Sequence, residues 1–201
     1  MASHDDVIAA SNRVADEYRI PRVLMLAAAC AESNLNPNAR RPANPADDER
    51  FWPDVSGGPW QQSVRFDPDY RGGSSYPGSE EVERILTLQR DVVRSAYVAG
   101  ANLAAKFRDG TETDDDENLI RDLFEYNWPA GHERPWTPET EANYRRGLKE
   151  ARAILGSTPM SPKVTYNRDE PAIAQNDAWS CAPTSARWAL TAVGRHPTEA
   201  W

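Results

Sequence analysis

Apolar residues recur at helical spacing in the first part of the chain, and they predict a pair of helices. One face of the first helix carries Val7, Ala10, Val14 and Tyr18. Ser3 and Asp6 have the spacing of a capping box, which marks where this helix begins. The segment 22–31 is apolar on every face, so it predicts a buried helix, and Pro21 suits its first position.

Helical patterns return further along the chain and make the predicted fold class mainly α. We expect helices over residues 80–107, with a break near Gly100, over 118–126 and over 139–155. Residues 34–77 are rich in proline, glycine and aromatic residues, which favours irregular loops with short helical turns.

A change of composition near residue 156 predicts the domain organisation. Residues 1–155 are expected to form a self-contained helical domain, because their helices supply a core. Residues 156–165 contain the glycine, serine and proline typical of a linker. The remaining segment, 166–201, is too short to bury a core of its own and predicts an incomplete second domain.

Composition and charge narrow the class of protein. The 201 residues are 39% hydrophobic and 27% charged, as in a soluble globular protein, and the net charge of −8 argues against non-specific nucleic-acid binding. Residues 112–117 are acidic and predict a solvated loop rather than a metal site. Cys30 and Cys181 are too few and too far apart for a disulfide framework. We expect neither a cofactor nor a metal.

The chain also lacks the pattern of a secretory signal or a membrane span. Its first residues are acidic, and its longest apolar run, residues 23–31, is too short to cross a bilayer. We therefore expect synthesis in the cytoplasm, no membrane span and export by another route. The expected state is a monomer or part of a larger polypeptide or virion.

One polar residue, Glu32, follows the predicted buried helix directly. Apolar walls and the negative end of the helix dipole both disfavour a charged carboxylate, so they predict a raised pKa. A carboxyl group that stays protonated near neutral pH is suited to donate a proton to a glycosidic oxygen. The alternative is a partly exposed glutamate at a helix end with no chemical role.

Three segments together resemble one family of enzymes. Residues 26–39, with Glu-Ser and later Asn-Pro-Asn-Ala, resemble the "ESxxNPxA" stretch of soluble lytic transglycosylases and goose-type lysozymes. Residues 54–62 resemble the "SxGLMQ" segment, with Pro59 in place of leucine, and residues 124–127 resemble the "AYNxG" segment. The resemblance covers about residues 5–155 in the family's order, and it implies a lysozyme-like helical domain with irregular loops.

The resemblance implies that this domain cleaves peptidoglycan glycan strands between N-acetylmuramic acid and N-acetylglucosamine. Glu32 would be its general acid and base. The substrate-binding residues would be Ser33, Trp60, Gln61, Tyr126, Asn127 and Tyr144. Aromatic rings among them could stack on sugar faces. The structural alternatives are a helix-ending turn for Ser33, a polar loop residue for Gln61 and a core aromatic for Tyr126.

The type of reaction depends on a second carboxylate. An inverting hydrolase needs one to activate water, and Asp54 is the candidate second acid. Ser63 stands where goose-type enzymes place the later acid. A lytic transglycosylase needs no such partner, because a hydroxyl of the substrate attacks and leaves a 1,6-anhydro product. The sequence therefore favours transglycosylation.

A second resemblance begins after the linker. Gln175 precedes Cys181 by six residues, and the cysteine opens an apolar helical pattern, as in papain-like cysteine peptidases of the bacteriocin-processing type. The resemblance implies an incomplete C-terminal segment of a papain-like α+β domain, with Cys181 as the nucleophile of a longer parent. The family's downstream histidine has no convincing counterpart before Trp201. The alternative is a structural cysteine.

These patterns predict a cell-wall lysin of phage or mobile-element origin that acts on the wall after lysis or as part of a tail. Two other function classes stay open at this point. The first is a noncatalytic peptidoglycan-binding module with a decayed site. The second is the N-terminal targeting part of a cysteine peptidase or amidase that uses Cys181.

Overall fold

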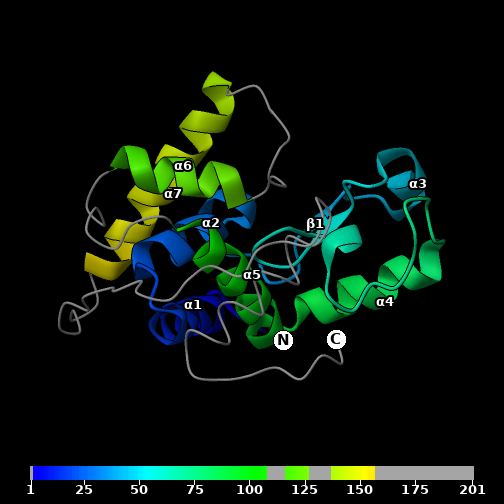
Figure 1. The fold of residues 1–201 in the computed structure, drawn as a ribbon, viewed down its shortest axis with the longest axis horizontal. Coiled ribbons are helices and arrows are strands. Elements are labelled where there is room, and N and C mark those ends of the chain that lie inside the picture. Colours follow the sequence, from blue (N-terminus) through cyan, green and yellow to red (C-terminus); the bar gives the residue numbers. More distant parts are fainter. Residues whose placement is uncertain (1, 108–115, 127–136, 157–201) are drawn as a thin grey trace.

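The computed structural model describes residues 2–107, 116–126 and 137–156, and these residues are mainly helical, as predicted. Five helices form a body around one apolar core (Figure 1). They are α1 (His4–Tyr18), α2 (Arg22–Ser33), α5 (Val92–Lys106), α6 (Asp116–Tyr126) and α7 (Pro138–Gly156). The predicted capping box of α1 is confirmed, because Ser3 Oγ accepts from the Asp6 amide and Asp6 Oδ2 accepts from the Ser3 amide.

Helix α2 is the centre of the body, as its apolar sequence predicts. Every residue from Leu24 to Ala31 is buried, and α7 packs along it. The two helices approach closely at Gly147, where an added Cβ would lie 2.7 Å from the Ala27 carbonyl oxygen. A side chain at this position would push α7 away from α2.

Two details of the predicted helices need correction. The break expected near Gly100 lies at Asp91, which caps α5 by accepting a hydrogen bond from the Arg94 amide. Gly100 serves packing instead, since a Cβ there would collide with the Tyr18 ring of α1. Pro21 is the N-cap residue of α2 rather than its first helical residue.

Helix α2 also extends beyond its predicted end at residue 31. Glu32 and Ser33 belong to its last turn, and the chain turns at Asn34, which has a left-handed φ of 55°. The Asn34 amide donates to the Cys30 carbonyl and the Leu35 amide donates to the Ala29 carbonyl. This C-terminal capping leaves Glu32 on a regular helix rather than on a loop.

Residues 36–90 form a smaller region, called the arm below, which lies to one side of the body (Figure 1). Its elements are β1 (Arg40–Arg41), the 3-10 helix η1 (Pro45–Asp47), α3 (Asp48–Phe51), β2 (Ser56–Gly57), β3 (Gln62–Ser63), the 3-10 helix η2 (Val64–Phe66) and α4 (Ser79–Arg90). The strands make one antiparallel sheet in the order β1-β2-β3. A separate core of six residues fills the arm: Val55, Val64, Tyr70, Val82, Ile85 and Leu86.

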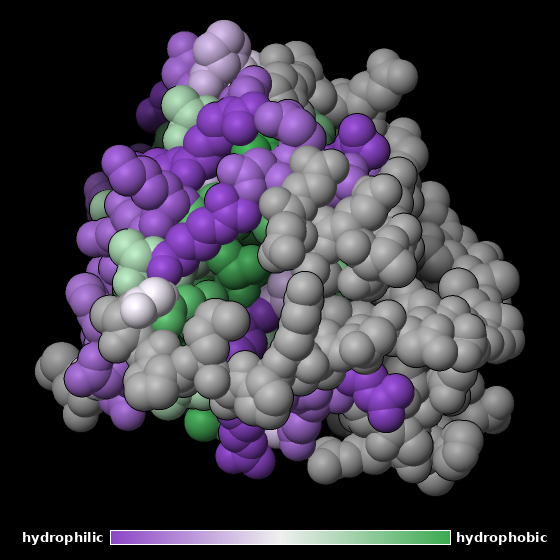
Figure 2. Space-filling view, turned by 90° about the vertical axis from the view of Figure 1, so that its left-hand side faces the viewer, coloured by the Kyte–Doolittle hydropathy of each residue, from purple (hydrophilic) through white to green (hydrophobic). Residues whose placement is uncertain are grey.

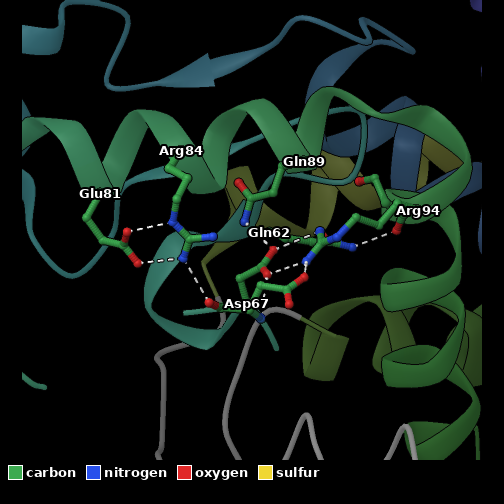
Figure 3. Close-up of polar contacts among 8 residues, drawn as sticks. Gln62, Asp67, Glu81, Arg84, Gln89 and Arg94 are labelled. Carbon is green, nitrogen blue, oxygen red and sulfur yellow. Dashed lines mark hydrogen bonds and ion pairs between the residues drawn. The ribbon is translucent and has the colours of Figure 1, made fainter. Parts of the chain in front are cut away.

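Charged groups connect the arm to α5. The fully buried Asp67 carboxylate lies 2.5 Å from Arg94 of α5 and accepts a hydrogen bond from Gln89 at 3.1 Å. In Figure 3 these groups meet in the middle of the view, and Arg84 pairs with Glu81 further along α4. The pair of Asp67 and Arg94 is mostly buried, whereas the pair of Arg84 and Glu81 lies on the surface.

The face shown in Figure 2 is mostly hydrophilic among its coloured residues, with hydrophobic residues in a recess between them. Within the described ranges, no helix is both long and apolar enough to cross a membrane. The predicted linker after Gly156 and the segment 166–201, including Gln175 and Cys181, lie outside the described residues.

Candidate functional site

Three helices of the body bring three predicted site residues together. Glu32 lies partly buried in the last turn of α2, and the Tyr144 hydroxyl of α7 donates to its Oε1 at 3.4 Å, a long contact. Tyr126, at the end of α6, is buried close enough for the charge of Glu32 to affect its hydroxyl. We call Glu32, Tyr126 and Tyr144 the carboxyl site.

The environment of Tyr126 shows how the carboxyl site is arranged electrostatically. Burial raises the pKa of Tyr126 well above its ordinary value. The charged form of Glu32 and the nearby Tyr144 raise it further, and a hydrogen bond from Gln62 lowers it. The phenol therefore stays protonated at neutral pH. It donates to the Trp60 carbonyl at 3.0 Å, which ties the end of α6 to the arm.

Ser33 joins the end of α2 to the loop that precedes β3. Its hydroxyl lies 2.7 Å from the Pro59 carbonyl and 3.2 Å from the Ala29 carbonyl, and it accepts from the Asn36 amide. A hydroxyl has one proton, so these two carbonyls share it. In this conformation Ser33 holds the loop against the helix, in line with the structural alternative of a helix-ending residue.

The prediction that Trp60 stacks on a sugar is wrong for this structure. Its side chain is completely buried in the body's core, and its indole N–H donates to the Met25 carbonyl at 3.2 Å. A ring with no exposed face cannot contact a ligand. Trp60 is a packing residue that inserts from the arm into the body.

The two neighbouring glutamines, Gln61 and Gln62, have different surroundings, and the sequence predicts a role for Gln61 alone. Gln61 has a left-handed φ of 44°, and its side chain bonds to the Gly58 carbonyl and to the Ser56 hydroxyl. Gln62 is the one beside Tyr126, and its amide also donates to the Ser95 carbonyl at 2.8 Å. Nothing in two consecutive glutamines distinguishes their directions, because these depend on the turn before β3.

The remaining predicted site residues lie outside this cluster or outside the described ranges. Asp54 is exposed on the arm just before β2. The Ser63 hydroxyl donates to the Pro53 carbonyl at 3.0 Å. Asn127 is among the residues that the structure does not describe.

Comparisons with known families, curated proteins and solved structures find no match to this chain. Among the described residues, no group of three or more histidine, cysteine, aspartate or glutamate side chains is arranged to hold a metal ion. The chemistry that the carboxyl site can perform is proton transfer. One partly buried carboxyl group lies beside a tyrosine hydroxyl on a scaffold of packed helices.

Proposed function

We propose that this chain is a peptidoglycan-cleaving glycosidase in which Glu32 is the general acid and base. The observation that carries the proposal is the position of Glu32, partly buried at the end of a buried helix, with the Tyr144 hydroxyl of α7 at its carboxyl group and Tyr126 of α6 near enough to be affected by its charge. The order of the three segments that resemble lytic transglycosylases and goose-type lysozymes supports it. Its substrate would be a glycan strand of the cell wall, in keeping with a phage or mobile-element lysin.

In the proposed reaction, the protonated Glu32 carboxyl gives its proton to the oxygen between two sugars as that bond breaks. The resulting carboxylate then takes a proton from the attacking hydroxyl, which restores the acid. The Tyr144 hydroxyl, 3.4 Å from Oε1, would keep the carboxyl oriented through both steps. A single carboxyl group is sufficient when the attacking hydroxyl belongs to the substrate.

Replacement of the proposed acid is the direct test. Glu32→Gln keeps the shape of the side chain and removes the transferable proton, so we expect clearing of purified cell walls to fall at least about a hundredfold. The thermal midpoint should stay close to that of the wild type. Glu141→Gln, on the exposed side of α7 where Glu141 pairs with Arg145, is the matched control and should keep full activity.

Retention of more than about a hundredth of the activity in Glu32→Gln would show that another group is the acid. Wild-type protein that binds cell walls without clearing them would instead favour a noncatalytic binding module. A peptidase reaction at Cys181 would survive Glu32→Gln and be lost in Cys181→Ala.

The product is expected to carry a 1,6-anhydro ring. Ser63 occupies the position where a water-activating acid would stand, and its hydroxyl is engaged with the Pro53 carbonyl. A substrate hydroxyl held within reach then has an advantage of effective concentration over water. Digestion in ¹⁸O-labelled water followed by mass spectrometry should show no label at the new sugar end. Incorporated label would mean hydrolysis, with Asp54 as the first residue to replace.

A further inference from the structure

Helix α7 contacts the C-terminal end of α2 through two polar side chains that stand on either side of Tyr144. Asn143 Nδ2 donates to the Ala31 carbonyl at 3.0 Å. Arg146 Nη2 lies 3.3 Å from the Cys30 carbonyl and 3.4 Å from the Ala31 carbonyl. These oxygens belong to the last turn of α2, the turn that carries Glu32.

The geometry of this contact bears directly on Glu32. The Ala31 carbonyl is part of the peptide group that joins Ala31 to Glu32, so a hydrogen bond to it restrains the Cα atom of Glu32. The same segment of α7 supplies the tyrosine hydroxyl that reaches the Glu32 carboxyl. Backbone and side chain of Glu32 are thus both held from one turn of α7.

Arg146 is itself held in place by its neighbours. Its Nη1 lies 2.9 Å from both carboxylate oxygens of Glu150, and its Nη2 donates to Asn143 Oδ1 at 2.8 Å. The guanidinium therefore orients the Asn143 amide so that its N–H faces the Ala31 carbonyl. Its positive charge also lies at the negative end of the α2 dipole, where a cation is favourable.

We propose that Asn143 and Arg146 are positioning residues that fix Glu32 for proton transfer. This inference rests on the proposed function, since it assigns the two residues to the reaction of Glu32. A displacement of about 1 Å at a reacting group can lower a rate roughly a hundredfold. Loss of either contact should therefore slow the chemical step more than it weakens substrate binding.

The test is the steady-state kinetics of full-length variants on solubilised glycan strands. We expect kcat to fall about 10- to 100-fold in Asn143→Leu and in Arg146→Met, with KM changed less than about twofold. Arg146→Lys keeps a positive charge near the helix end and should recover part of the loss. Arg145→Met, on the exposed side of the same helix, is the control and should keep wild-type kcat.

Each measurement is made well below the thermal midpoint of the variant, so that unfolded protein does not lower kcat. Asn143→Leu keeps the pair of Arg146 with Glu150 and carries the test if Arg146→Met does not fold. Wild-type kcat in Asn143→Leu, or a loss confined to KM, would overturn the positioning role while Glu32→Gln stays inactive. Activity in Glu32→Gln would overturn the proposed acid and this inference with it.

Discussion

The body and the arm are stabilised in different ways. The body has a continuous apolar core built from five helices, and its central helix contributes eight consecutive buried residues, Leu24–Ala31. The arm has a six-residue apolar core and adds mostly buried ion pairs: Asp48 with Arg40 inside the arm, and Asp67 with Arg94 of α5. A small region buries a smaller share of its apolar surface, so it depends more on polar contacts.

This difference predicts two kinds of sensitivity. The stability of the body depends mainly on its apolar side chains, because shortening one of them leaves a cavity between the packed helices. The stability of the arm should fall most when one partner of a buried ion pair is removed. An enclosed ion pair adds little net stability when intact, but an unpaired buried charge is costly.

The largest expected effect is the protection of the Cys30 thiol from alkylation, which reports on the contact between α2 and α7 in the body. Burial and, to a smaller extent, the negative charge of Glu150 raise the pKa of this thiol to about 12, although the positive charge of Arg146 lowers it. At pH 8 the thiolate, the form that reacts, is then about a thousandfold rarer than for a thiol of pKa 9.0. In a Cys181→Ser background, alkylation of Cys30 should therefore be much slower in folded than in urea-unfolded protein.

Alkylation at a rate near that of unfolded protein would mean that α7 leaves α2 readily. The matched comparison is Gly147→Val, which places a branched side chain against the Ala27 carbonyl and the Ala31 Cβ atom. This variant should react faster, because overpacking separates the two helices.

Asp67→Asn is expected to have the next largest effect and to act on the arm. It leaves Arg94 with Asp69 alone, so the free energy of unfolding should fall by about 2–3 kcal/mol. This is below the loss for a fully enclosed pair, because Arg94 is 21% exposed. Urea denaturation followed by tryptophan fluorescence gives the value. An unchanged midpoint would show that the pair does not hold the arm.

The same variant tests whether the two regions unfold together. If the arm unfolds without the body, Cys30 in Asp67→Asn should keep its slow alkylation in dilute urea. The fluorescence change of Trp52, which packs against the arm's core, should then occur at a lower urea concentration than in the wild type. If alkylation of Cys30 becomes fast at the same urea concentration at which the fluorescence changes, the arm and the body unfold as a single cooperative unit.

Glu81→Gln should have the smallest effect, since its partner Arg84 lies on the surface of α4 (Figure 3). The pKa of Glu81 is lowered by its hydrogen bond with Arg84, so the pair contributes stability above the unfolded pKa and loses it as the pH falls. Solvent screens this contribution, and we expect the thermal midpoint to fall by less than about 2 °C at pH 7. A larger loss would show that this pair supports the arm as Asp67 does.

The parts of the fold that the sequence predicts are those with a strong local pattern. The apolar segment 22–31 and the capping box at Ser3 identify α2 and α1 without tertiary information. The strands of the arm have two residues each, too few for a periodic pattern. The sequence predicts a helix break near Gly100, but this residue provides room for a neighbouring helix, which only the packed structure reveals.

In the candidate site, too, some features follow from a local sequence pattern and others depend on tertiary contacts. Glu32, Tyr126 and Tyr144 do lie together, although their roles stay predictions. The sequence predicts that Trp60 faces a ligand, whereas the structure buries it, because burial depends on tertiary contacts that local sequence does not contain. Asn143 makes a contact across 112 residues, so no local signal could indicate its role.

The burial of Trp60 has a consequence for how the molecule can move. Its indole is enclosed by the body although its backbone belongs to the arm, and its carbonyl receives the Tyr126 hydroxyl. Extraction of a tryptophan that buries about 150–250 Å² would cost on the order of 4–6 kcal/mol. At that cost a form with the arm swung away from the body would be only a minor population, so the arm keeps one orientation relative to the body nearly all of the time. A ligand must meet a geometry that is already set, and fluorescence of this buried indole should change little when one binds.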